Sequence, residues 1–429
     1  MRGDVDVVLN NVFGFSNFRP GQREIINNIN KGRDVLAVMP TGAGKSLCFY
    51  IPAILMPGVT LVISPLISLM QDQVNFLTSK GVSAQQINSS ITSGMCKKIL
   101  NETVNLKYKI IYVAPERLLT KDFKDMAHKL NISMVVFDEA HCISAWGYDF
   151  RPAYLKMCCF LKCLKKRPVF ACFTATATEK VRDDIKKILN LNNPYCTVPK
   201  FDRENLFLDV FHVEEKYKLV KLLSLLAKIK DKNIIIYCGT RANVERIYSI
   251  LCFKGYKAAR YHAGLGTTQR KRSQEDFFSG NVNILVATNA FGMGVDKKDI
   301  RYIIHFNMPA NIENYYQEAG RAGRDGAPCS GIMFYSSYDV NLNKFFIENV
   351  NNNEITDAEL LAVKKNNYEN LNSIVKYCEY SGCYKSYILQ YFGEYIERCN
   401  NCGNCLKGSS RIISKILGFF GLSKKFKKN

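Results

Sequence analysis

The sequence lacks the two patterns that mark membrane or exported proteins. It has no apolar run near the roughly 20 residues that span a bilayer, and its N-terminus has no basic-then-apolar signal segment. We therefore expect an intracellular protein in solution, nuclear if the source is eukaryotic and otherwise cytoplasmic, without a membrane partner.

Acidic residues are scarce relative to basic ones. Asp and Glu number 38 against 59 Lys and Arg, which leaves a formal net charge of +21. An excess of this size favours a polyanionic partner, and nucleic acid is the leading candidate. A merely basic soluble protein is the alternative. Because the chain has 429 residues, we expect two or three domains rather than one core.

The sequence has no disulfide framework, although it contains 16 cysteines. Four of them lie in apolar segments, where a free thiol behaves as a small hydrophobic group: Cys48, Cys172, Cys238 and Cys252. This usage is typical of a reducing compartment. Only the cysteines near the C-terminus have the spacing of metal ligands.

The stretch from Met39 to Ser46 has the spacing G-x-x-x-x-G-K-S, with Met39 in place of the first glycine. An apolar strand over 34–38 precedes it and a helix is expected from residue 46 to 55, so the loop would present backbone N–H groups to phosphates. Lys45 would reach the β- and γ-phosphates of ATP, and Ser46 would bind Mg²⁺. A glycine-rich turn is the alternative. The expected phosphate loop consists of Thr41, Gly42, Ala43, Gly44, Lys45 and Ser46.

Two adjacent carboxylates follow the apolar strand over 134–137. Asp138 can hold the Mg²⁺ that Ser46 also contacts, and Glu139 can polarise the water that attacks the γ-phosphate. Helix capping is the alternative function of such a pair.

A segment upstream of the phosphate loop is suited to base recognition. The Gln22 side chain offers both a donor and an acceptor to an adenine edge, and Phe15 or Arg19 can stack on the base. A turn followed by a helix cap is the alternative.

These motifs together resemble RecQ-family DNA helicases of superfamily two. The resemblance rests on Phe18-Arg19-Pro20-Gly21-Gln22, the phosphate loop, Asp138-Glu139-Ala140-His141 and the stretch 140–152, and it extends from about Phe13 to Cys405. It implies an α/β fold with two RecA-like parallel-sheet lobes and a small helical zinc-binding subdomain. The expected boundaries are 1–198 for the first lobe, 199–338 for the second, 339–408 for the zinc-binding subdomain and 409–429 for a short basic tail.

Within this resemblance, residues 140–152 correspond to an aromatic-rich loop that couples single-strand binding to ATP hydrolysis. Trp146 and Phe150 can stack on bases and Arg151 offers a charge, while Ala145 and Tyr148 stand where the family has Gln and His. A buried aromatic cluster is the alternative. Thr288, in a later motif, is expected to contact DNA phosphates.

The stretch 315–326 resembles the helicase motif that supplies catalytic arginines. Arg321 and Arg324 lie three residues apart, hence on one helix face. The resemblance implies that Arg324 is an arginine finger completing the ATP site between the lobes, with Arg321 beside it. A surface arginine pair is the alternative. The second half has no phosphate loop of its own, as expected if it supplies arginines instead.

The C-terminal cysteines Cys383, Cys399, Cys402 and Cys405 have the spacing C-x15-C-x2-C-x2-C. Four thiolates so spaced predict a closed, structural Zn²⁺ site. Cys378 is a rival for the first ligand, but the resemblance favours Cys383, because Tyr391-Phe392-Gly393-Glu394 follows it at the family's distance.

We therefore predict an enzyme that uses ATP, Mg²⁺ and Zn²⁺ and acts as a 3′ to 5′ DNA helicase in recombination, repair or replication. Its partner would be DNA, either single-stranded or as a tailed or forked duplex. The alternatives are a DNA-stimulated ATPase or translocase and a strand-annealing factor, because the chain leaves no room for the winged-helix domain of larger relatives.

Overall fold

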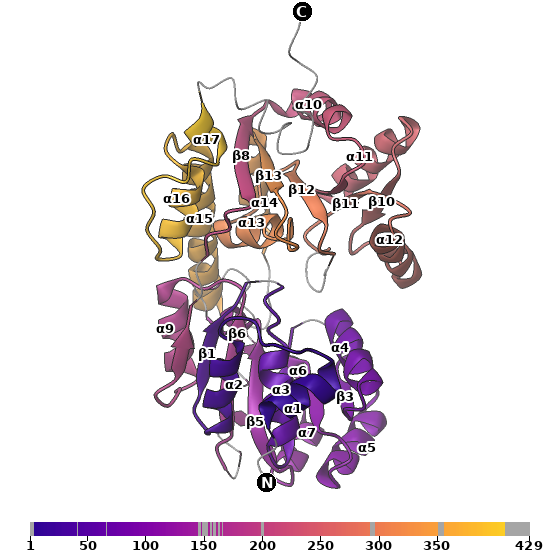
Figure 1. The fold of residues 1–429 in the computed structure, drawn as a ribbon, viewed down its shortest axis with the longest axis vertical. Coiled ribbons are helices and arrows are strands. Elements are labelled where there is room, and N and C mark those ends of the chain that lie inside the picture. The colour runs from indigo at the N-terminus through magenta and orange to yellow at the C-terminus, as the bar shows by residue number, and fades with distance from the viewer. Residues whose placement is uncertain are drawn as a thin grey trace, which may run out of the picture. The chain divides into compact units, whose positions relative to one another are not determined.

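The protein consists of two compact units, residues 1–199 and 200–429, each of which contains one parallel sheet (Figure 1). The computed structural model describes residues 4–40, 42–65, 67–144, 147, 153–154, 157, 160–161, 164, 166–198, 201–291, 297–350 and 356–407.

The first unit is formed by a seven-stranded sheet with the order β3-β4-β2-β5-β6-β1-β7. Its central strands are buried along their whole length, as expected for a parallel sheet that is covered on both faces. The strands are β1 (Val35–Val38), β2 (Val59–Ile63), β3 (Ala84–Ile87), β4 (Ile110–Val113), β5 (Ile132–Asp138), β6 (Val169–Thr174) and β7 (Tyr195–Thr197). The helices are α1 (Val5–Val8), η1 (Leu9–Phe13), α2 (Gln22–Asn30), α3 (Leu47–Leu55), α4 (Ile67–Ser79), α5 (Ser93–Val104), α6 (Pro115–Leu118), α7 (Lys121–Ala127), η2 (Ala140–Ile143) and α9 (Glu179–Ile188).

This topology brings the two nucleotide motifs to one edge of the sheet. Strands β5 and β1 are both neighbours of β6, and all three run parallel. Their carboxyl ends therefore meet at the same edge, where open α/β sheets bind ligands. The phosphate loop follows β1 and the acid pair ends β5.

The second unit is formed by a six-stranded parallel sheet with the order β10-β11-β9-β12-β13-β8. Its strands are β8 (Leu206–His212), β9 (Asn233–Tyr237), β10 (Ala258–Tyr261), β11 (Ile284–Ala287), β12 (Ile300–His305) and β13 (Cys329–Tyr335). Its helices are α10 (Glu215–Lys228), α11 (Arg241–Phe253), α12 (Thr267–Ser279), α13 (Ile312–Ala319), α14 (Ser337–Glu348), α15 (Asp357–Glu379), α16 (Tyr384–Tyr391) and α17 (Gly403–Leu406).

The chain becomes helical after β13, and these helices belong to the second unit. α16 and α17 lie beside the edge strand β8, as the yellow elements in Figure 1 show. A backbone bridge joins Leu208 of β8 to Cys402. The two parallel-sheet lobes and the helical region with its cysteine cluster confirm the predicted fold class.

Candidate nucleotide site and cysteine cluster

The phosphate loop of the first unit leaves several backbone donors available. Gly42 and Gly44 have positive φ angles of 86° and 80°, which glycine adopts without a steric cost. Among the described residues, the N–H groups of Gly44, Lys45 and Ser46 donate to no acceptor, whereas the next N–H, of Leu47, returns to the Gly44 carbonyl. Three consecutive free donors before helix α3 suit an anion such as a phosphate.

The Gln22 side chain holds this loop in place. Its Nε2 donates to the carbonyls of Gly44 at 2.9 Å and Ala43 at 3.2 Å, and its Oε1 accepts the Arg19 N–H at 2.8 Å. Arg19 also donates to the Gly42 carbonyl. A Cβ at Gly44 would lie 2.4 Å from Gln22 Nε2. Gln22 and Arg19, which the sequence suggested for base recognition, therefore also fix the loop. Phe15, the third residue suggested for that role, has an exposed side chain.

Lys45 lies between the two carboxylates at the end of β5. Its Nζ is 3.3 Å from Asp138 Oδ1 and 3.1 Å from Glu139 Oε1. Burial alone lowers the pKa of Lys45, but the charges of Glu139 and Asp138 outweigh it and the net pKa is raised. Burial also raises the pKa of Asp138, which the Lys45 ammonium opposes. The structure thus joins the lysine and both acids in one charge cluster.

Two further residues join this cluster, His141 and Thr174, which were not among the predicted site residues. His141 Nδ1 lies 2.9 Å from Thr174 Oγ1 and 3.4 Å from Glu139 Oε2. The Thr174 hydroxyl donates to the Thr176 carbonyl, so it accepts from His141, and Nδ1 carries the proton. The arrangement links Glu139 to the Thr174–Thr176 turn after β6. The spacing of Asp138-Glu139-Ala140-His141 was the available signal for His141.

The second unit holds the two predicted arginines in a turn after α13. Arg321 is only 3% exposed, and its Nε and Nη1 have no hydrogen-bond partner among the described residues. Its guanidinium contacts the Tyr237 hydroxyl, which donates to the Phe291 carbonyl at 2.8 Å. Arg324 is half-buried in the same turn. A buried cation with unused donors is suited to an anionic ligand.

The four predicted cysteines meet in one cluster, and the sulfur atoms of Cys383, Cys399, Cys402 and Cys405 all lie within 4.8 Å of one another. Two of the pairs, Cys399–Cys405 and Cys402–Cys383, are 3.9 Å apart. Zn–S bonds of about 2.3 Å in a tetrahedron require sulfur separations of roughly 3.8 Å. A hydrogen bond from the Cys399 thiol lowers the pKa of Cys402, and the same bond raises the pKa of Cys399. The cluster therefore fits zinc, whereas Cys378 lies elsewhere, with its sulfur 3.5 Å from that of Met333.

Several predicted site residues lie outside the described residues: Thr41, Trp146, Phe150 and Arg151. The basic tail over 409–429 also lies outside them. Thr288 is described, and its Oγ1 accepts the Ala290 N–H at 3.4 Å just after β11.

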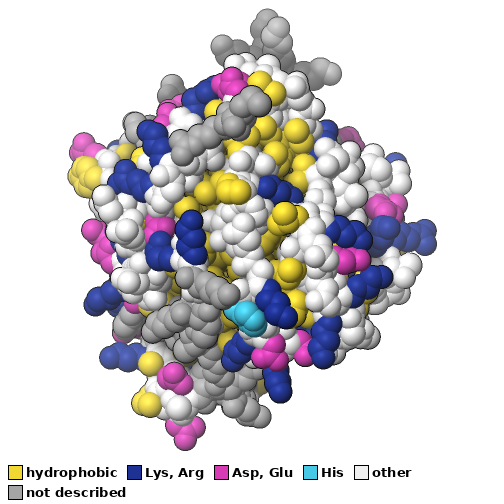
Figure 2. Space-filling view, turned by 90° about the horizontal axis from the view of Figure 1, so that it is seen from below, with side chains coloured by type: hydrophobic (Ala, Val, Ile, Leu, Met, Phe, Trp, Pro, Cys, Tyr) yellow, Lys and Arg dark blue, Asp and Glu magenta, His cyan; other side chains and the backbone are white. Residues whose placement is uncertain are grey.

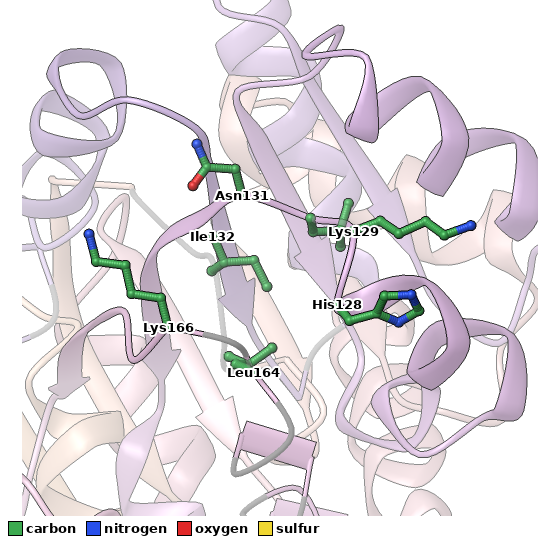
Figure 3. A pocket seen from close by; sticks show the side chains of 7 residues that line it. His128, Lys129, Asn131, Ile132, Leu164 and Lys166 are labelled. Atoms are coloured by element: carbon green, nitrogen blue, oxygen red, sulfur yellow. The ribbon is translucent and has the colours of Figure 1, made fainter.

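A pocket of about 250 Å³ opens at the amino-terminal end of β5 (Figure 3). It lies away from the carboxyl edge where nucleotides bind to such sheets. The side chains of Lys129 and Lys166 point in different directions, so they do not converge on one ligand (Figure 3). We assign no function to this pocket.

Basic side chains are spread over the face that Figure 2 shows. On the face in Figure 2, Lys and Arg side chains are separated by hydrophobic and uncharged areas. Among the described residues, no helix combines the length and apolar character needed to cross a membrane.

The geometry defines a protein with two parallel-sheet lobes, one of which carries a phosphate loop beside an acid pair, and comparison with known families places it among the helicases. The family described as DEAD/DEAH box helicase matches residues 19–185, and the helicase conserved C-terminal domain matches 217–326. The RecQ zinc-binding family matches 337–406.

The chain is also similar to curated proteins and solved structures. It is 42% identical to the ATP-dependent DNA helicase RecQ of Pasteurella multocida over 402 residues, which are 93% of this chain and 62% of that protein. It is 38% identical to a protein of Acanthamoeba polyphaga mimivirus named as a candidate ATP-dependent RNA helicase, covering 95% of this chain and 73% of that protein. Saccharomyces cerevisiae Dbp5 bound to RNA and ADP BeF3 shares the fold, with a TM-score of 0.63 and 20% identity over 85% of this chain and 97% of that one.

These findings show that the chain belongs to the RecQ family. It spans a little over three fifths of the length of the bacterial RecQ relatives, 62% and 63% for two of them.

Proposed function

We propose that this chain hydrolyses ATP in order to move 3′ to 5′ along single-stranded DNA and to separate duplex strands. The observation that carries the proposal is the position of Lys45, between Asp138 and Glu139 and beside three free backbone donors. Membership of the RecQ family supports the ATP-dependent step, and the polarity follows from the family resemblance.

The first unit would bind the nucleotide. Its loop amides and Lys45 would contact the phosphates, and Lys45 would exchange its carboxylate partners for phosphate oxygens. Two carboxylates repel a bare polyphosphate, and Mg²⁺ held by Ser46 and Asp138 would supply the compensating charge. Glu139 would then be free to orient the attacking water. Phe15, Arg19 and Gln22 would border the base.

The second unit would contribute Arg321 and Arg324 to stabilise charge on the γ-phosphate. Thr288 would contact the DNA backbone. In the first unit, Trp146, Phe150 and Arg151 would contact bases and phosphates of the single strand.

We also propose that Cys383, Cys399, Cys402 and Cys405 hold one structural Zn²⁺. The sulfur separations support four-coordinate binding. The amide of Cys399 donates to Cys383 Sγ at 3.3 Å and that of Asn401 to Cys399 Sγ at 3.3 Å. Such N–H donors orient and stabilise thiolate ligands.

The direct test measures ATP hydrolysis with and without single-stranded DNA, alongside displacement of a strand from a 3′-tailed duplex. We expect DNA to stimulate hydrolysis and the strand to be displaced, and a 5′-tailed duplex controls for polarity. Stimulated hydrolysis without displacement would instead indicate a translocase. A matched RNA substrate tests the nucleic acid, since one relative is named for RNA. Hydrolysis that neither nucleic acid stimulates would contradict the proposal.

Two variants test the assigned roles. Lys45→Ala removes the phosphate-binding charge, and Glu139→Gln removes the base while keeping the shape. Both should lower kcat by about 10²- to 10⁴-fold, the usual contribution of such groups. Glu139→Gln should still bind ATP. Normal turnover by either variant would refute its role.

A further inference from the structure

The segment Phe201–Asn205, which we call the clamp segment, contacts two parts of the second unit. One is helix α13 with the turn after it that carries Arg321 and Arg324, which we call the arginine turn, and the other is the cysteine-bearing region. The Phe201 ring stacks on Phe392 with centroids 4.6 Å apart and lies 5.9 Å from the Tyr316 ring. Its N–H donates to Glu394 Oε1 at 2.6 Å, and its carbonyl accepts the Tyr316 hydroxyl. The start of the clamp segment is therefore fixed from two sides.

Arg203 of the clamp segment holds the backbone of the arginine turn. Its Nη1 donates to the Gly320 carbonyl at 2.6 Å, and its Nη2 donates to the carbonyls of Ala322 at 2.9 Å and Gly323 at 2.7 Å. These carbonyls follow the C-terminus of α13, where a helix leaves acceptors without intrahelical partners. A positive charge is also favourable at this end of the helix dipole.

Asn205 restrains the same turn from the other end of the clamp segment. Its Nδ2 donates to the carbonyls of Gly323 at 2.8 Å and Ala327 at 2.9 Å. Gly323 has φ of 58°, and a Cβ there would lie 2.6 Å from Asn205 Nδ2 and 2.5 Å from Cys329 Sγ. The turn is packed so closely that it has little freedom to shift while these contacts persist.

The turn held in this way carries Arg321 and Arg324. Arg321 is almost fully buried with unused donors, so its guanidinium can reach a ligand only from the place that its backbone defines. A displacement of about 1 Å in a catalytic group can cost 10²-fold in rate.

Lys385 connects the clamp segment to the cysteine cluster. Its Nζ donates to the Arg203 carbonyl at 2.6 Å and lies 3.3 Å from Asp202 Oδ1. The Lys385 side chain is only 6% exposed. It follows Cys383 by two residues, at the start of α16, and Cys383 is the N-cap of that helix.

We propose that Arg203 is a positioning residue for Arg321 and Arg324. We also propose that Lys385 connects Arg203 to helix α16, whose N-cap is Cys383. The inference rests on the proposed ATP hydrolysis. It assigns to the cysteine region the task of keeping the arginine turn in its active geometry, in addition to stabilising the fold.

The test is Arg203→Lys, which keeps the charge but replaces the two separate terminal nitrogens of the planar guanidinium by a single nitrogen, so it cannot reproduce the bonds from Nη1 and Nη2 to the turn. We expect DNA-stimulated kcat to fall by about 10- to 100-fold, because the arginines would be displaced. The Kd for ATP, the zinc content and the Tm should change little. Arg33→Lys is the matched control, since Arg33 also donates to a backbone carbonyl, that of Asn193 at 2.8 Å, outside the proposed site.

A double-mutant cycle separates positioning from general stability. Replacing both Arg321 and Arg324 by alanine should lower kcat, and adding Arg203→Lys to that variant should cause almost no further loss if Arg203 acts through these two arginines. Losses in kcat that multiply would overturn the inference, as would a Tm or zinc content that falls in step with kcat. Asn205→Ala, a milder change at the same turn, should lower kcat in the same direction.

Hydrogen exchange provides a readout that needs no activity. The amides of Gly323 and Gly326 are bonded to the Ile300 and Gly323 carbonyls, and they should exchange faster in Arg203→Lys. Unchanged exchange would overturn the inference. If the unmutated chain hydrolyses ATP and Arg203→Lys is equally active, the positioning role of Arg203 is contradicted while the proposed function stands. If the unmutated chain is inactive with every nucleic acid, the proposed function falls as well.

Discussion

Lys45 compensates the charge of Asp138 and Glu139 when no nucleotide is bound. Without it, two buried carboxylates would lie side by side with no nearby cation, which is costly. Under the proposed function, the same lysine would change partners when phosphates bind, so one ammonium group would couple nucleotide binding to the release of Glu139.

Glu313 on α13 is a second buried carboxyl and lies in the second unit. It is 3% exposed. Its Oε1 accepts the Tyr391 hydroxyl at 2.7 Å, and its Oε2 has no partner among the described residues. Burial raises the pKa of Glu313, which the hydrogen bond from Tyr391 partly opposes.

This raised pKa predicts a pH-dependent stability. The folded state binds the proton more tightly than the unfolded state, so ionised Glu313 destabilises the fold. This penalty is absent below the ordinary glutamate pKa and is complete once pH exceeds the raised value. Glu313→Gln should therefore increase the free energy of unfolding at pH 8, and the gain should shrink as pH falls. Urea unfolding across that range measures it.

Glu397→Gln, at an exposed position, controls for the loss of one negative charge. A lower free energy of unfolding for Glu313→Gln at pH 8 would show that the ionised carboxyl is stabilising and would contradict the prediction.

The residue contacts also show what the sequence could and could not predict about the site. The phosphate loop, the acid pair and the cysteines are recognisable because each motif is local and its chemistry depends on spacing. Gln22 was assigned to base recognition from its donor and acceptor groups, whereas its additional contact with the loop carbonyls cannot be read from a linear pattern. Arg203 lies more than 100 residues from the turn that it holds, and one basic residue in a short segment gives no signal for such a contact.

At the scale of elements, α10 and α14 are joined by a buried ion pair. Lys218 Nζ lies 2.8 Å from Asp339 Oδ1 and 2.6 Å from Oδ2, and both side chains are fully buried. Asn307, which follows β12, donates to Asp339 at 3.0 Å and accepts the Gly239 N–H at 3.0 Å. The network therefore connects both helices to the end of β9.

We predict that Lys218→Met destabilises the second unit by about 3–5 kcal/mol, because it leaves the charge of Asp339 buried without its cation. The double variant Lys218→Met with Asp339→Asn should cost less than the two single changes together. Urea unfolding of all four proteins measures the coupling.

The exposed ion pair Lys186–Asp183, 2.9 Å apart on α9, is a matched control. Its coupling free energy in the same double-mutant cycle should be less than about 1 kcal/mol. Additive losses at Lys218 and Asp339 would contradict the prediction.

At the scale of the whole molecule, the resemblance to RecQ-family helicases predicted the two parallel sheets. The strand expected over 34–38 is β1 at Val35–Val38, and the one expected over 134–137 lies within β5 at Ile132–Asp138. Strand order was not predictable, because it depends on contacts between distant segments. The edge positions of β3, β7, β8 and β10 therefore emerge only from the structure.

We predict that zinc removal affects the second unit and spares the first. In calorimetry, a nucleotide with Mg²⁺ should raise the transition of the first unit. A zinc chelator should lower the unfolding temperature of the second unit by more than about 5 °C. A loss of about 2 kcal/mol in the free energy of unfolding corresponds to roughly 4–8 °C in a domain of this size.

Added zinc should restore the lower transition, and a variant with Cys402→Ser should resemble the chelated protein without responding to zinc. A chelator that lowers only the nucleotide-sensitive transition would contradict this assignment.

The bridge between Leu208 and Cys402 has a consequence for synthesis of the chain. β8 is the first strand of the second unit, yet its partners are β13 and the last cysteine-bearing segment. While the ribosome is still translating the intervening residues, one edge of β8 has nothing to pair with. Strand β8 gains its sheet partner β13 only after more than 100 further residues, and its other edge meets Cys402 only after nearly 200. Such long-range closure folds slowly, so the exposed edge of β8 makes the unfinished chain prone to aggregation.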